Sequence, residues 1–136
     1  MVDRDHAMQA EDLFGSVSRV IRLDETLFEP ATDLMGCAPA IYAAILDEFV
    51  QSGCRNSGID ENLAYEMALR TFTGTGLLLG HMTPDEIIPR VATPGGITEE
   101  GVLLLREGLP SLFDSLFRKT GEKNEILRDS IRKSSS

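Results

Sequence analysis

The segment from Ala40 to Val50 constrains the fold more than any other part of the sequence. Only Asp47 and Glu48 interrupt its apolar side chains, so a helix formed here is hydrophobic around most of its circumference. A helix of that kind is buried, because a surface helix keeps one polar face toward water. The segment therefore predicts a central helix that has packing partners on several sides.

Apolar residues at helical spacing predict further helices along most of the chain, and thus a mainly α fold. Asp60 stands where an N-cap is expected, and Thr83 followed by Pro84 is typical of a helix start. Gly53 and Gly58 predict a loop before Asp60. The expected helices run from about Leu27 to Met35 with a break near Gly36, from Pro39 to Val50, from Asp60 to Leu79, from Pro84 over a short stretch, from near Thr98 to Glu107 or Gly108, and from Pro110 toward Ile131.

These helices carry more apolar surface than one small bundle can hide. Large exposed apolar patches on a folded chain mark interaction surfaces. The sequence therefore predicts partner helices that cover this surface.

The first 23 residues have a different character. Apolar residues at helical spacing predict a short helix from Asp5 to Phe14, and the run from Ser18 to Leu23 has the β-branched content of a strand. A single strand leaves its backbone donors and acceptors unpaired. This strand is therefore expected to belong to a sheet outside the chain.

Composition bounds the class of protein. At 136 residues and 42% hydrophobic, the chain is the size of one domain. Its net charge of −9 opposes binding to nucleic acid or to an anionic membrane, and no apolar stretch approaches the roughly 20 residues that span a bilayer. A soluble, cytoplasmic protein is expected.

No metal site is expected. Cys37 and Cys54 are two thiols without further ligands at metal-site spacing, and they are interpreted as buried and free. His6 and His81 lie far apart in the sequence and are interpreted as surface residues.

Residues 74–80 read Gly-Thr-Gly-Leu-Leu-Leu-Gly and superficially resemble a dinucleotide-binding fingerprint. The last glycine falls one residue late and no strand precedes the run, so the motif is rejected. Glycine costs about 1 kcal/mol relative to alanine inside a helix. Close packing of another backbone against Gly74 and Gly76 is the expected use of these residues.

Residues 92–99 form a glycine turn that leads directly into a helix. Gly95 and Gly96 allow close backbone approach, and the N–H groups of Gly96, Ile97 and Thr98 are candidates for an anion site at the helix N-terminus. The Thr98 hydroxyl adds a further donor. In the alternative interpretation, Thr98 only caps the helix and the glycines only turn the chain.

Three segments together resemble the C-terminal domain of pyrroline-5-carboxylate reductases, the enzymes that form proline. Residues 34–41 read Leu-Met-Gly-Cys-Ala-Pro-Ala-Ile, where the family carries Leu-Ser-Gly-Ser-Gly-Pro-Ala-Tyr. Residues 70–74 read Arg-Thr-Phe-Thr-Gly, where the family has Gln-Thr and, after two intervening residues, a glycine. Residues 93–98 read Thr-Pro-Gly-Gly-Ile-Thr, similar to the family's Ser-Pro-Gly-Gly-Thr-Thr. The order and spacing agree over roughly residues 24–120.

The resemblance implies an intertwined helical domain at residues 24–133 that forms a homodimer or a higher homo-oligomer, preceded by the final helix and strand of a Rossmann-type nucleotide-binding domain at 1–23. The small polar residues at 134–136 predict a disordered tail. It implies that Gly95, Gly96, Ile97 and Thr98 bind a small carboxylate substrate, with Thr98 also close to the ring nitrogen as the candidate catalytic residue. The full-length protein would use NAD(P)H. This chain alone is expected to bind no cofactor and to have no activity.

The sequence also departs from the family pattern. Met35, Cys37 and Ala38 replace small or hydroxylated residues, Arg70 replaces a glutamine, and Arg106 stands where a glutamate is common. Two alternatives to a proline-biosynthesis oxidoreductase are a divergent imine reductase and a stand-alone helical interaction module without catalysis.

Overall fold

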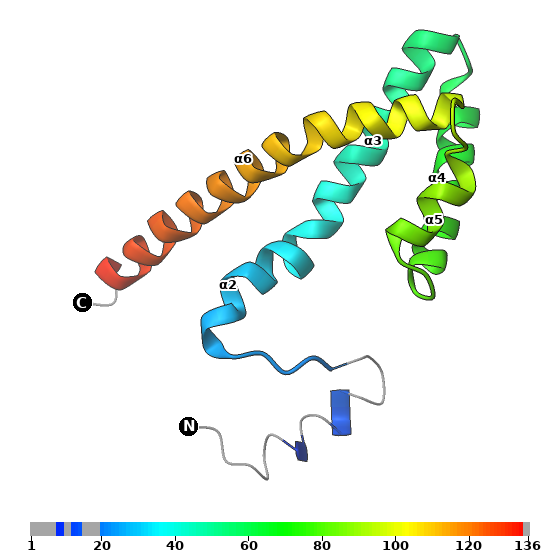
Figure 1. Cartoon of the computed structure of the whole chain (residues 1–136). Coiled ribbons are helices and arrows are strands. Elements are labelled where there is room, and N and C mark those ends of the chain that lie inside the picture. Colours follow the sequence, from blue (N-terminus) through cyan, green and yellow to red (C-terminus); the bar gives the residue numbers. More distant parts are fainter. Residues whose placement is uncertain (1–7, 10–11, 15–19, 135–136) are drawn as a thin grey trace.

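The computed structural model of the chain describes residues 8–9, 12–14 and 20–134, and no strand is present in that part (Figure 1). The mainly α fold class is confirmed. The elements are a 3-10 turn at Glu25–Leu27, α2 at Phe28–Ala31, a π-helical segment at Thr32–Cys37, α3 at Ala38–Ser57, α4 at Glu61–Leu79, α5 at Pro84–Val91 and α6 at Ile97–Ser134.

The predicted break near Gly36 is wrong, because the chain stays helical from Glu25 to Ser57. Pro39 has no N–H to donate to the carbonyl of Met35, and its ring crowds that carbonyl. The π-helical segment Thr32–Cys37 lies directly before this point, and its wider turn gives the proline ring room. The helix therefore widens where the sequence predicted an end.

The predicted start of α4 is confirmed. Asp60 caps it, with the Asp60 Oδ1 atom accepting a hydrogen bond from the backbone N–H of Leu63 at 3.1 Å. The loop prediction at Gly53 is wrong, since α3 continues to Ser57. Gly58 then ends α3 with a φ of 72°. Glycine adopts this left-handed conformation without steric cost.

Helices α3 and α4 pack against each other as an antiparallel pair (Figure 1). The rings of Tyr42 and Phe72 lie 6.4 Å apart at a tilt of 58°. At the other end of the pair, the amide of Gln51 donates to the carboxylate of Glu61 at 2.7 Å. Val50 is 3% exposed and lies at the centre of the small core of the chain.

Helix α6 is a single long helix that crosses α3 and extends beyond it (Figure 1). The predicted division near Gly108 and Pro110 is wrong. Proline inside a helix costs about 3 kcal/mol because the carbonyl four residues earlier loses its partner. Here that carbonyl belongs to the exposed Arg106, where water can reach it. The Ser111 hydroxyl also donates to the carbonyl of Gly108 at 3.1 Å.

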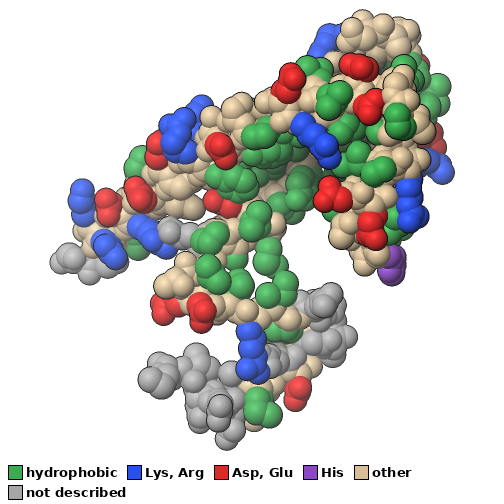
Figure 2. All heavy atoms as spheres, in the orientation of Figure 1, with side chains coloured by type: hydrophobic (Ala, Val, Ile, Leu, Met, Phe, Trp, Pro, Cys, Tyr) green, Lys and Arg blue, Asp and Glu red, His purple; other side chains and the backbone are tan. Residues whose placement is uncertain are grey.

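Very little of the described chain is buried. Only Ala38, Val50 and Asp33 are, whereas Phe49 and Leu77 are each 71% exposed. Figure 2 shows apolar side chains gathered along α3 and the facing side of α6. Burial of one large apolar side chain stabilises by about 1.5–3 kcal/mol, while ordering each residue costs about 1–2 kcal/mol. A core of this size cannot stabilise the fold of the isolated chain.

The predicted close packing at Gly74 and Gly76 does not occur within the described chain. A Cβ atom added at either glycine would meet nothing within 4 Å. Both residues lie inside α4 as predicted. Any backbone that packs there lies outside the described residues.

A polar contact joins α6 to the π-helical segment. The Thr120 hydroxyl lies 3.1 Å from the Asp33 Oδ2 atom and 3.1 Å from the carbonyl of Phe117. A hydroxyl carries one hydrogen, so it can donate to only one of these acceptors at a time. Asp33 is 9% exposed, and its Oδ1 atom has no hydrogen-bond partner in the described part of the chain.

The predicted N-terminal elements are only partly described. Residues 8–9 and 12–14 are helical, as the sequence predicts, while the rest of that helix lies outside the described residues. Residues 20–24 have no regular secondary structure, so the predicted strand is not formed in this part of the chain. Residues 18–19 of the predicted strand and residues 135–136 of the tail lie outside the described residues. The domain limits at 23 and 133 stay predictions.

Within the described residues, no helix has the length and apolar character needed to cross a membrane.

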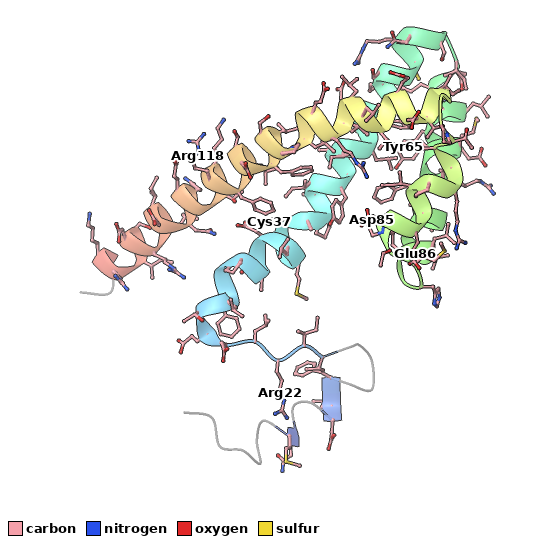
Figure 3. All side chains as sticks on the ribbon, viewed as in Figure 1. Arg22, Cys37, Tyr65, Asp85, Glu86 and Arg118 are labelled. Carbon is pink, nitrogen blue, oxygen red and sulfur yellow. The ribbon has the colours of Figure 1, made fainter. Side chains whose placement is uncertain are left out.

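Helix α5 starts with the predicted cap. The Glu86 carboxylate accepts a hydrogen bond from the backbone N–H of Thr83 at 2.8 Å and from its hydroxyl at 3.0 Å. Figure 3 labels Glu86 beside Asp85 at the start of this helix. The backbone hydrogen bond first, and the hydroxyl second, hold the pKa of Glu86 below its ordinary value of 4.5. Both bonds favour the charged form of the carboxyl.

We predict that Thr83→Val moves the pKa of Glu86 up toward 4.5, because one of its two hydrogen bonds is lost. In the wild type, the lowered pKa means that the cap stabilises α5 fully above pH 4.5 and loses this effect as the pH falls through the folded-state pKa. An NMR pH titration of the Glu86 carboxyl measures the shift. An unchanged titration in the variant would contradict this assignment.

We predict that Thr120→Val lowers the free energy of unfolding by about 1–2 kcal/mol, because it leaves the buried Asp33 carboxylate without its donor. Thr73→Val is the matched control, since the exposed Thr73 hydroxyl bonds only the carbonyl of Leu69. Urea unfolding at one fixed protein concentration compares the two. Equal losses in both variants would show that the contact with Asp33 contributes nothing.

Candidate functional site

The glycine segment between α5 and α6 forms a tight turn. The N–H of Gly96 donates to the carbonyl of Thr93 at 2.9 Å, which closes the turn over Pro94 and Gly95. Gly95 has a φ of 73°, so the turn has the type II arrangement, with proline second and glycine third. The Pro-Gly pair in the sequence specifies this geometry.

The two glycines are required for different reasons. Gly95 needs its left-handed backbone conformation. At Gly96 the constraint is space, because an added Cβ would lie 2.8 Å from the Thr93 Oγ1 atom and 2.9 Å from the Thr93 carbonyl oxygen. A side chain at position 96 would therefore push the turn open.

Two N–H groups near the predicted anion site are bonded within the turn. The N–H of Gly96 is occupied by the Thr93 carbonyl, and that of Gly95 donates to the Glu99 carboxylate at 2.7 Å. Neither group is available to a ligand in this arrangement. The remaining donors of the predicted set are the N–H groups of Ile97 and Thr98.

Ile97 and Thr98 are the first two residues of α6, where N–H groups have no intrahelical partner. Both residues are exposed, Ile97 to 93%. The N-terminal end of a helix also carries a partial positive charge that favours anions. This end of α6 can therefore receive a carboxylate, with the Thr98 hydroxyl as an additional donor.

Glu99 is the residue at this turn that the sequence interpretation missed. Its carboxylate reaches back to the Gly95 N–H, much as Glu86 reaches back to Thr83 at the start of α5. The capping-box signature has serine or threonine three residues before the acidic residue. Glycine stands there in this sequence, at position 96, so the pattern was not apparent.

A cavity of about 280 Å³ lies between α5 and the first turns of α6. Its charged lining residues are Asp85, Glu99 and Arg106, and the rest of its lining is mostly apolar. Figure 3 labels Asp85 on the α5 side of this region. Ile97 and Thr98 do not line this cavity.

A larger hollow of about 810 Å³ lies between α3, α4 and α6. Its lining is almost wholly apolar and includes Phe49, Met67, Phe72 and Leu105. Such a surface has few groups that could orient a polar ligand. It suits the side chains of another helix.

The chain shows no cradle for a dinucleotide in the part that the structure describes. Residues 74–80 lie within and at the end of α4, whereas a dinucleotide fingerprint needs a strand, a turn and a helix start. The described residues contain no group of three or more metal-ligating side chains. Cys37 and Cys54 are free thiols and half-buried, less buried than predicted.

The comparisons with known proteins agree with this arrangement. The family described as "Pyrroline-5-carboxylate reductase dimerisation" matches residues 25–127. Pyrroline-5-carboxylate reductase 3 of Bacillus subtilis is 35% identical over 124 residues, which are 90% of this chain and 46% of that protein. The chain thus spans less than half the length of this relative.

Two solved structures share the fold. The 1-pyrroline-5-carboxylate reductase of Streptococcus pyogenes matches with a TM-score of 0.78 and 26% identity, over 90% of this chain and 48% of that one. The pyrroline carboxylate reductase of Plasmodium falciparum, solved with NADP bound, matches with a TM-score of 0.70, 21% identity and the same shares of both chains. The chain therefore belongs to the pyrroline-5-carboxylate reductase family and contains its dimerisation domain.

Proposed function

We propose that this chain is the dimerisation and substrate-carboxylate-binding domain of an NAD(P)H-dependent reductase that acts on pyrroline-5-carboxylate in proline biosynthesis. The observation that carries the proposal is the glycine turn that presents the N–H groups of Ile97 and Thr98 at the start of α6. These donors suit the carboxylate of such a substrate. The Thr98 hydroxyl adds a hydrogen bond and lies next to the substrate ring nitrogen.

Gly95 and Gly96 have an indirect part in this site. Their N–H groups are used within the turn, so they shape the backbone that holds Ile97 and Thr98 in place. We further propose that the hydride donor is held by a nucleotide-binding domain to which residues 1–23 belong.

The partner in this proposal is a second copy of the chain. The family match describes dimerisation, and the apolar hollow between α3, α4 and α6 leaves Phe49 71% exposed. Isologous pairing of two chains covers the same surface on both. The second copy thereby supplies the core that the single chain lacks.

We predict that the wild-type chain is a homodimer and that Phe49→Ser raises its dissociation constant by about 30-fold or more, because a central aromatic residue contributes about 2 kcal/mol or more to an interface. Glu48→Ser, one residue earlier on α3, is the matched control. Its exposed ion pair with Arg55 contributes little. Sedimentation equilibrium measures both constants. A monomeric wild type would refute the assembly.

We predict that the chain binds L-proline, a stable carboxylate relative of the substrate, and that Thr98→Ala weakens binding by about 10- to 100-fold, because a hydrogen bond to a charged group contributes about 1.5–3 kcal/mol. NMR titration follows the amides of residues 95–99, with Thr73→Ala as the control. Binding that survives in Thr98→Ala would remove Thr98 from the site. No binding by the wild type would favour a stand-alone interaction module, and a preference for another cyclic imino acid would favour a divergent imine reductase.

A further inference from the structure

We propose that α6 docks on the rest of the chain in two registers one helical turn apart, with Thr120 beside the buried Asp33 in one and Asn124 beside it in the other. The structure shows the Thr120 register. The inference does not depend on the proposed function, because it rests only on the contact between α6 and the π-helical segment.

The carboxylate of Asp33 is incompletely bonded in the Thr120 register. Asp33 is 9% exposed, and its Oδ1 atom has no hydrogen-bond partner in the described part of the chain. Its Oδ2 atom faces the Thr120 hydroxyl, whose single hydrogen is also within reach of the Phe117 carbonyl. A buried acceptor without a donor costs free energy. A register that brings more donors to Asp33 is therefore a competitor of the observed one.

Asn124 can supply these donors. It follows Thr120 by four residues, so the two side chains lie on the same face of α6. Asn124 is half-buried, and its amide has no hydrogen-bond partner among the described residues. It lines a hollow of about 220 Å³ together with Thr32, the residue before Asp33. An amide nitrogen carries two hydrogens, whereas a hydroxyl carries one.

The apolar face of α6 repeats with the same spacing of four residues. Residues 111–117 read Ser-Leu-Phe-Asp-Ser-Leu-Phe, so the triplet Ser-Leu-Phe occurs twice, one turn apart. Leu105 and Leu109, and also Leu127 and Ile131, are related in the same way. Packed side chains normally resist sliding because they interlock. Here a shift by one turn replaces apolar side chains by the same or similar ones.

The contacts of α6 leave it able to move. No described side chain of this helix is buried, so a shift breaks little packing. Gly121, which must pass Asp33, has no side chain, and an added Cβ there would meet nothing within 4 Å. A shift of four residues moves a helix by about 6 Å along its axis. Packed helices are known to switch by steps of about one turn.

The register of α6 also determines where the glycine turn lies. Ile97 and Thr98 are the first residues of the same continuous helix. An axial shift of α6 therefore carries them along relative to α3. Any partner or ligand that favours one register positions the start of α6 as well.

The test measures a distance between α3 and α6 in the full 136-residue chain. Spin labels are attached at Asp47→Cys and Lys119→Cys, two exposed positions, after Cys37 and Cys54 are replaced by serine. Excess unlabelled chain ensures that each assembly carries one labelled copy. Pulsed electron paramagnetic resonance then gives the distribution of label distances.

The two registers differ in this distance because α3 and α6 run antiparallel. Leu105 lines a hollow with Phe49, whereas Thr120 meets Asp33 near the other end of α3. The shift that brings Asn124 to Asp33 therefore moves position 119 toward position 47. The shorter distance belongs to the Asn124 register.

We expect both distances in the wild type. Thr120→Val should raise the population of the shorter distance relative to the longer one by about tenfold or more, because the Thr120 register loses its hydrogen bond to a charged group. Asn124→Leu should remove the shorter distance. Thr120→Ser keeps a hydroxyl, and Lys123→Leu changes an exposed neighbour, so both should retain the wild-type ratio.

A single distance that neither Thr120→Val nor Asn124→Leu changes would overturn the inference, and so would an equal effect of Lys123→Leu. Urea unfolding at one fixed protein concentration gives a second readout. Because each residue substitutes for the other beside Asp33, Thr120→Val and Asn124→Leu together should lower the stability by more than the sum of their separate effects. Additive losses would contradict the exchange of donors.

Discussion

The apolar circumference of α3 is the constraint on which the rest of the structure depends. One chain covers only part of it, through the pairing with α4. Hydrophobic burial is the main favourable term in folding, and this chain buries little of its own apolar surface. Folding and association are therefore coupled, as in many obligate dimers. The match to a dimerisation family is consistent with an association of this kind.

Local hydrogen bonds, rather than burial, set the geometry of the candidate site. The turn is closed by Thr93, fixed by the conformation of Gly95 and tied to α6 by Glu99. These interactions lie within seven residues of one another, so the turn does not depend on the long-range core of the chain. The turn can therefore keep its shape when the contacts of the surrounding helices change.

The sequence predicted the elements whose signals are local. Asp60 and Thr83 start helices as expected, because a capping side chain acts within one turn of its own backbone. Pro39 and Pro110 were interpreted as helix boundaries, and both proved to lie within continuous helical structure. Proline predicts a lost hydrogen bond. Whether the helix ends there depends on the surroundings of the freed carbonyl, which the sequence does not reveal.

The sequence predicted the location of the candidate site but not which of its N–H groups are free. The Pro-Gly-Gly run located the turn, yet which N–H groups stay free depends on backbone angles and on where Glu99 points. A sequence lists donors and acceptors without stating how they pair. For the same reason, the sequence could predict a strand at residues 18–23 only together with a sheet outside the chain, and the described residues 20–23 form no strand.

The π-helical segment at Thr32–Cys37 has a consequence for how this family can change during evolution. A π turn holds more residues than an α turn, and each residue rotates an α-helix by about 100°. Deleting one residue here would rotate the side chains of α2 by roughly that angle around the axis of α3. The number of residues in the segment thus sets the direction in which α2 faces. Insertion or deletion of a residue there could reorient α2 relative to α3 without any amino-acid substitution.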